Sequence, residues 1–189
     1  SATESERNAA NFLADEFAAV GYNVELQPLT VDIGVSQLSV GGGSRKFQSL
    51  PMVKSKTGRV SGTLVHVGKA LQEDMSFETL EGKIALVERG QITFDEKVTR
   101  VASKGALATL VYNNRVGLFQ GTLVNQVDIP VLSMSREGGE AILELMADVD
   151  LEATVSFSVE TRDTQNVIAE KPGTSEKNRV VVLGAHYDT

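Results

Sequence analysis

The sequence predicts a mixed α/β fold on three observations. Apolar runs of strand length alternate with amphipathic segments of helix length through the middle of the chain. Two of these helical segments follow capping residues, Thr93 and Ser135. Residues 180–183, Val-Val-Val-Leu, are dense in β-branched side chains, which is typical of a strand buried on both faces of a parallel sheet.

The chain begins with a predicted helix. Thr3 and Glu6 form a capping-box pattern, apolar residues follow at helical spacing, and Gly21 stands where a helix would end. A second capping box, Thr93 with Glu96, opens a helix over 94–104. A third helix follows Ser135. The predicted strands are, in order, 22–29, 35–40, 60–67, 84–87, 107–112, 129–134, 151–159, 166–170 and 180–183.

Composition excludes several classes of function. The net charge is −7, from 18 basic and 25 acidic residues, and no Lys/Arg run offers the cationic face that nucleic acids need. No apolar run is long enough to span a bilayer, so neither nucleic acid nor membrane is an expected partner. The chain has no cysteine, which rules out disulfides and Cys-based zinc sites. Its polar, acidic start is not a signal peptide.

The chain has two histidines, and one of them stands in a pattern that points to metal chemistry. His186 and Asp188 lie two residues apart after the run 180–183, so on a strand they share one face. Ligands of open α/β sheets bind at this carboxyl end of the strands. A metal-bound imidazole is commonly oriented by a carboxylate, although a solvated polar strand end remains the alternative for this pair. His66 has no neighbouring ligand in the sequence, which favours a structural or surface role.

The tail and the middle of the chain resemble two parts of one protein family. The segments 166–173 (Asn-Val-Ile-Ala-Glu-Lys-Pro-Gly) and 180–189 (ending Gly-Ala-His-Tyr-Asp-Thr) resemble the entry to the catalytic domain of co-catalytic zinc aminopeptidases of the aminopeptidase S and Y, or leucyl aminopeptidase-like, type. Residues 22–28 look like the strand that opens that domain. The middle of the chain is similar to a protease-associated (PA) domain in the segments 80–90, 94–97, 104–106, 111–114, 129–131 and 135–137.

The order of these likenesses implies a domain plan. Residues 1–30 would start the catalytic domain, 31–161 would be an inserted PA domain of the swivelling β/β/α type, and 162–189 would resume the catalytic domain, a partial parallel-sheet zinc-peptidase domain. We expect the catalytic part to be truncated after the His-x-Asp motif. The fragment would then be inactive by itself, because a catalytic zinc needs about three protein ligands.

The resemblance also implies roles for residues. His186 would be a direct zinc ligand, and Asp188 would orient it. The intact enzyme would use two zinc ions to polarise the scissile carbonyl and activate water, and would hydrolyse N-terminal peptide bonds. The fragment itself is expected to bind no zinc tightly. A secreted or cell-surface location is expected from the family.

Two functions stay open for the PA domain. It would act as a lid or substrate-access module of the aminopeptidase, with a peptide or protein as partner. Alternatively, it would be a stand-alone protein- or peptide-binding module without catalysis. The apolar run 180–183 is expected to be exposed in the fragment and to favour homodimers through strand pairing.

Overall fold

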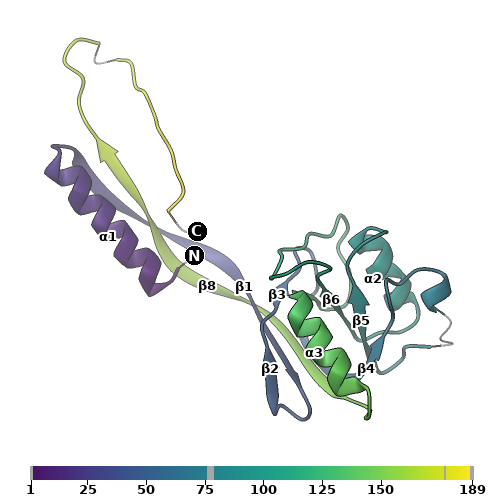
Figure 1. Cartoon of the computed structure of the whole chain (residues 1–189). Coiled ribbons are helices and arrows are strands. Elements are labelled where there is room, and N and C mark those ends of the chain that lie inside the picture. Colours follow the sequence, from purple (N-terminus) through teal and green to yellow (C-terminus); the bar gives the residue numbers. More distant parts are fainter. Residues whose placement is uncertain (1, 76–78, 177, 188–189) are drawn as a thin grey trace. The chain divides into compact units, whose positions relative to one another are not determined.

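The computed structural model describes residues 2–75, 79–176 and 178–187, and it divides the chain into two compact units (Figure 1). The central unit comprises residues 34–159. The terminal unit combines both ends of the chain, residues 1–33 and 160–189. The predicted mixed α/β class is confirmed, because helices flank a sheet that contains parallel and antiparallel strands.

Four parallel strands form the middle of the sheet in the central unit: β4 (Gly58–His66), β5 (Lys83–Glu88), β6 (Ala108–Tyr112) and β7 (Val131–Met134). The full strand order is β2-β1-β8-β4-β5-β6-β7-β3. The remaining strands are β1 (Asn23–Val40), β2 (Arg45–Phe47), β3 (Leu50–Pro51) and β8 (Glu152–Glu170), and the pairs β1–β2, β3–β7 and β4–β8 are antiparallel.

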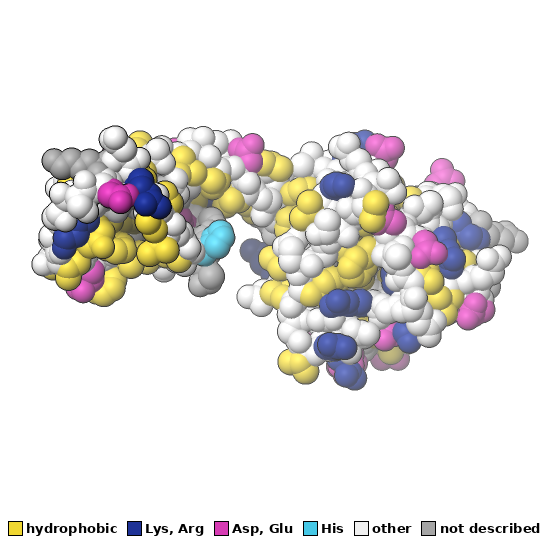
Figure 2. All heavy atoms as spheres, turned by 90° about the horizontal axis from the view of Figure 1, so that it is seen from above, with side chains coloured by type: hydrophobic (Ala, Val, Ile, Leu, Met, Phe, Trp, Pro, Cys, Tyr) yellow, Lys and Arg dark blue, Asp and Glu magenta, His cyan; other side chains and the backbone are white. Residues whose placement is uncertain are grey.

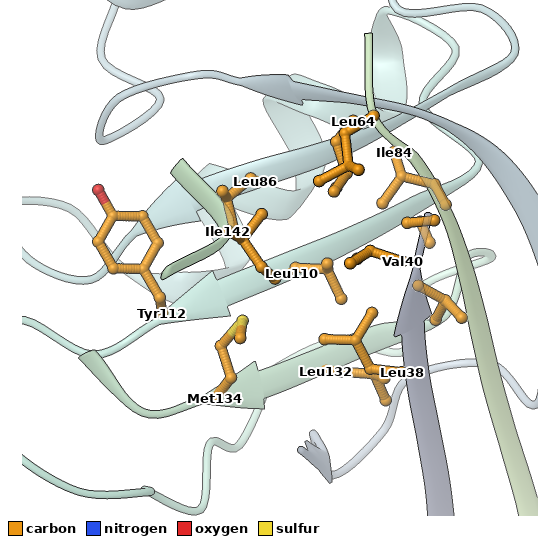
Figure 3. Packing of buried hydrophobic residues seen from close by; sticks show 14 residues of the cluster. Leu38, Val40, Leu64, Ile84, Leu86, Leu110, Tyr112, Leu132, Met134 and Ile142 are labelled. Atoms are coloured by element: carbon orange, nitrogen blue, oxygen red, sulfur yellow. The ribbon is translucent and has the colours of Figure 1, made fainter. Parts of the chain in front are cut away.

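Two helices cover opposite faces of these parallel strands. The register pairs Leu86 with Leu110, and Ile142 of α3 (Arg136–Met146) packs on that face (Figure 3). On the other face, α2 (Phe94–Ser103) packs through Val98 and Val101. A short 3₁₀ helix, η1 (Glu73–Met75), lies between β4 and β5. The two-residue periodicity of the strands thus supplies both layers of the core.

The core of the central unit is fully enclosed. Ile84, Leu86 and Leu110 have no exposed surface. Complete burial of one such side chain contributes about 1.5–3 kcal/mol. All three hydrophobic clusters in the described part of the chain lie within this unit.

The predicted capping box of α2 is confirmed. The Thr93 hydroxyl accepts a hydrogen bond from the Glu96 backbone N–H at 3.2 Å, and the Glu96 carboxylate accepts one from the Thr93 N–H at 3.0 Å. These bonds satisfy two backbone N–H groups that the helix cannot pair internally. The helix therefore begins at Phe94 as the sequence predicts.

The terminal unit contains α1 (Glu4–Ala19) and the outer parts of β1 and β8. Thr3 caps α1, accepting a hydrogen bond from the Glu6 N–H at 3.1 Å. The Asn166 side chain donates to Gln27 at 3.0 Å, which links the two strand segments. Among the residues described in this unit, Ala10 is the only buried one.

Two expectations about strands are corrected by the structure. The two strands predicted over 22–29 and 35–40 are one continuous strand, β1. Those predicted over 151–159 and 166–170 are likewise one strand, β8. The residues between the predicted strands contain no Pro, and Gly34 is the only Gly among them. Because β1 and β8 are hydrogen-bonded neighbours in the sheet, both strands continue through these residues.

The run 180–183 was predicted to form a strand, and this is wrong. Its four side chains are 82–94% exposed, and no strand is assigned to it. A β-branched run needs a neighbouring strand to satisfy its backbone groups, and none of the described strands pairs with this one. The expected exposure of these apolar residues is confirmed. No helix among the described residues is long and apolar enough to cross a membrane.

Candidate functional site

The predicted metal site lies in the C-terminal segment of the terminal unit. The side chain of His186 is exposed, and the neighbouring Tyr187 hydroxyl donates to the backbone oxygen of Gln165. Asp188 lies outside the described residues. Within the described ranges, no three His, Cys, Asp or Glu side chains gather closely enough to hold a metal ion. The residues described therefore do not make up a zinc site, and the roles of His186 and Asp188 stay predictions.

A cluster of polar side chains does form elsewhere, at the carboxyl ends of the parallel strands. His66 ends β4, Glu88 ends β5 and Tyr112 ends β6. Because these strands are parallel and adjacent, their last residues meet at one edge of the sheet. That edge is where open α/β sheets bind ligands.

His66 and Tyr112 are in contact at this edge. His66 Nε2 lies 3.2 Å from the Tyr112 hydroxyl oxygen, and the two rings are 6.1 Å apart. Partial burial lowers the pKa of His66 below its usual value, and the attraction of Glu88 and Asp74 opposes this shift. The neutral imidazole is therefore favoured, and which atom donates the hydrogen bond depends on its tautomer.

Tyr112 is held in place by the helix above it. Burial raises the pKa of its hydroxyl to about 12, with Glu88 and Glu140 adding to the shift, so the phenol is neutral. Figure 3 shows its ring at the end of β6, with the hydroxyl directed away from the labelled core side chains. A Cβ added at Gly139 of α3 would lie 2.4 Å from the Tyr112 Cβ, so this close approach requires glycine.

Glu88 interacts with two lysines at this edge, Lys69 and Lys97. Its carboxylate lies 3.9 Å from the Lys69 ammonium. Lys97 of α2 is fully buried and donates to the backbone oxygen of Lys69. Burial lowers the pKa of Lys97 to about 8, against the opposing attraction of Glu88 and Asp74.

Arg89 follows Glu88 in the segment between β5 and α2. Its guanidinium lies 4.7 Å from the centre of the Phe119 ring and 5.8 Å from that of Phe94. Its Nη1 donates to the side-chain oxygen of Asn113 at 3.2 Å. Asn113 in turn donates to the backbone oxygen of Gly117 at 2.9 Å. The arrangement fixes the plane of the guanidinium.

Sequence reasoning predicted a structural or surface role for His66 but missed its contact with Tyr112, the burial of Lys97 and the stacking of Arg89. The contact was in principle detectable, because His66, Glu88 and Tyr112 each lie within one residue of the end of a predicted strand. The missing information was that these strands are neighbours in the sheet. Lys97 gave no signal, because a lysine in an amphipathic helix usually faces solvent.

Comparisons with known proteins find a match to one family within the central unit. Residues 60–142 match the PA domain family. The probable leucine aminopeptidase 2 of Arthroderma benhamiae is 40% identical over 116 residues, which cover 59% of this chain and 23% of the relative. Aminopeptidase YwaD of Bacillus subtilis is 29% identical over 194 residues, or 99% of this chain and 41% of the relative.

A solved structure shows the same likeness in three dimensions. The zinc aminopeptidase from Bacillus subtilis superimposes with a TM-score of 0.71 at 27% identity, over 92% of this chain and 43% of that enzyme. The predicted resemblance, a PA domain in a chain similar to zinc aminopeptidases, is confirmed. The chain spans less than half the length of these relatives.

Proposed function

We propose that this chain, whose residues 60–142 belong to the PA domain family, is the PA-containing part of a zinc-dependent aminopeptidase that hydrolyses N-terminal peptide bonds. One observation carries the proposal. The similarity to aminopeptidase YwaD extends over 99% of the chain, and so over the terminal unit as well as the PA domain. A PA domain alone would account only for the central unit.

The domain plan follows from the same observation. Residues 31–161 are proposed to be an insert, and 1–30 and 162–189 to be two pieces of one catalytic domain. The terminal unit supports this assignment because it is built from both ends of the chain, as an interrupted domain would be. Its exposed apolar side chains, visible as yellow areas in Figure 2, are those that further parts of a larger domain would cover.

The zinc chemistry belongs, in this proposal, to the whole enzyme. His186 would be one metal ligand and Asp188 would orient its ring. Further ligands and the general base would come from residues that this chain does not contain. The chain itself is then expected to bind no zinc tightly and to cleave nothing.

The PA domain would control access of the peptide or protein substrate, or hold an interacting protein. A secreted or cell-surface location is proposed by analogy with the family. The second candidate, a PA domain that binds a protein or peptide without catalysis, is favoured by one feature. All the described hydrophobic clusters lie inside the central unit, so the PA domain can fold around a core of its own.

Zinc titration calorimetry tests the proposal when this chain is compared with a longer product of the same gene that continues past Thr189. The longer protein should bind two zinc ions and cleave aminoacyl-nitroanilides, and His186→Ala in it should weaken metal binding. This chain alone should do neither. A longer protein that binds no zinc and cleaves nothing would leave the binding-module function in its place.

A further inference from the structure

A pocket of about 330 Å³ lies beside Arg89, where the segment after β5 leads into α2. Its apolar lining comes from Ile92, Phe94 and Val124. Arg89 and Asp95 supply its charged groups. All of these residues belong to the central unit, so the pocket is complete within the PA domain.

Arg89 lines this pocket, and its guanidinium has no acidic partner among the described residues. The guanidinium is held by its stacking on Phe119 and by one hydrogen bond to Asn113. Across the described ranges of the chain, no carboxylate lies within 4.0 Å of it. Arg89 is half-buried, and the rigid fork of N–H donors on its guanidinium matches a carboxylate ligand.

Asp95, the other charged residue of the lining, makes no ion pair with Arg89, and its carboxylate accepts hydrogen bonds from other groups. One oxygen accepts a hydrogen bond from the Val124 backbone N–H at 2.7 Å. The other accepts from the backbone and side chain of Asn125, at 2.8 and 3.3 Å. The Asp95 charge is therefore fixed in the lining of the pocket. It would repel ligands with two or more negative charges, such as phosphates, more strongly than a monocarboxylate.

The apolar part of the lining indicates which chemical group of the ligand lies next to its carboxylate. Val124 is 71% exposed although it borders the pocket, and Phe94 presents the ring that also contacts Arg89. Covering these side chains with an apolar group would release water from them. We propose that this pocket binds the C-terminal carboxylate of a short peptide that ends in an apolar residue, with Arg89 pairing the carboxylate.

This inference does not depend on aminopeptidase activity, because it requires only binding by the central unit. The titration uses the whole ¹⁵N-labelled chain and the peptide Ala-Ala-Leu, with the same peptide amidated at its C-terminus for comparison. The expected result is a shift of backbone resonances at Gly90, Phe94 and Val124. The free acid should bind at least about tenfold more tightly than the amide, since a hydrogen bond to a charged group is lost in the amide.

Two variants locate the effect. Arg89→Gln should abolish the preference for the acid, whereas Arg45→Gln, which removes one exposed charge from β2, should keep it. Thermal melts check that both variants fold. If Arg45→Gln weakens binding as much as Arg89→Gln, the attraction is long-range and the assignment to Arg89 is overturned.

The comparison of acid and amide tests the proposal even if Arg89→Gln fails to fold. Equal binding of the two peptides, shifts confined to other residues, or no shift at millimolar peptide would each overturn it. A third peptide, acetyl-Ala-Glu-Leu-amide, separates the two sources of a carboxylate. If it binds as tightly as Ala-Ala-Leu, the pocket recognises acidic side chains and the commitment to a peptide C-terminus is wrong.

Discussion

The central and terminal units use the same local signals but differ in what covers them. Both contain a helix capped by threonine, Thr93 in α2 and Thr3 in α1. In the central unit, Val98 and Val101 of α2 are fully buried, whereas in α1 Phe12 and Val20, its C-cap residue, are about 60% exposed. Capping and periodicity thus specify a helix in both places, but only packing against other elements gives it tertiary stability.

The largest expected difference between the units comes from truncating an apolar side chain in each. Leu110→Ala in β6 should lower the free energy of unfolding by about 2–5 kcal/mol, because it opens a cavity in a closed core. Val182→Ala in the C-terminal segment should change it by less than about 0.5 kcal/mol, because that side chain is already in water. Urea denaturation measures both. Similar losses would mean that residues 180–183 are covered in solution, as in a dimer.

A second comparison uses two adjacent glycines of α3. Alanine at either position gains about 1 kcal/mol of helix propensity. At Gly139 the new Cβ would lie 2.4 Å from the Tyr112 Cβ and Cγ, so Gly139→Ala should destabilise the protein by about 1–3 kcal/mol in spite of that gain.

The matched control is Gly138→Ala, whose Cβ would meet the flexible end of Met134 at 2.9 Å. We expect this change to be neutral or slightly stabilising in thermal melts. Equal effects of the two substitutions would show that the contact of α3 with Tyr112 is looser than described.

The third comparison removes a cap from each unit. Thr93→Ala should cost about 1 kcal/mol of global stability, because the capping box of α2 supports a helix that belongs to the core. Thr3→Ala should fray α1 and reduce helical circular dichroism, while the main unfolding transition stays in place. If Thr3→Ala shifts that transition as far as Thr93→Ala does, the two units unfold as one.

The smallest expected effect is a dependence of the free energy of unfolding on pH, caused by His66 at the edge of the central sheet. Burial lowers the pKa of His66, so the folded state favours the neutral ring. The stabilisation this gives is present above the unfolded pKa of about 6.5 and is lost as the pH falls below it. In His186→Asn, where His66 is the only histidine left, NMR titration of the ring should give a midpoint below 6.5. A midpoint above 6.5 would mean that the attraction of Glu88 and Asp74 outweighs burial.

Sequence patterns predicted the elements of the central unit well, because propensity and burial agree there. The apolar run 84–87 and the capping box at Thr93 each correspond to an element found in the structure. The run 180–183 has the composition of a buried strand but no partner among the described strands, so its propensity has no ladder to join. The β-propensity of a segment indicates that it can form a strand, whereas pairing with a neighbouring strand determines whether it does.

The candidate site was less predictable, since its parts come from separate strands. His66 and Tyr112 are 46 residues apart in the sequence, and their contact depends on the order of β4, β5 and β6. The stacking of Arg89 on Phe119 likewise depends on the course of the loop after β6. Periodicity reveals faces of elements but not their neighbours.

Native-state hydrogen exchange of the whole chain tests the central claim most directly. If the central unit is a self-contained PA domain and the terminal unit is an incomplete one, the amides of β5 and β6 should exchange only by global unfolding. The amides of α1 should exchange through local opening. Their protection factors should be at least about 100-fold lower than those of β5 and β6. Equal protection of α1 and β6 in a monomer would contradict the account, because it would require a complete core in the terminal unit.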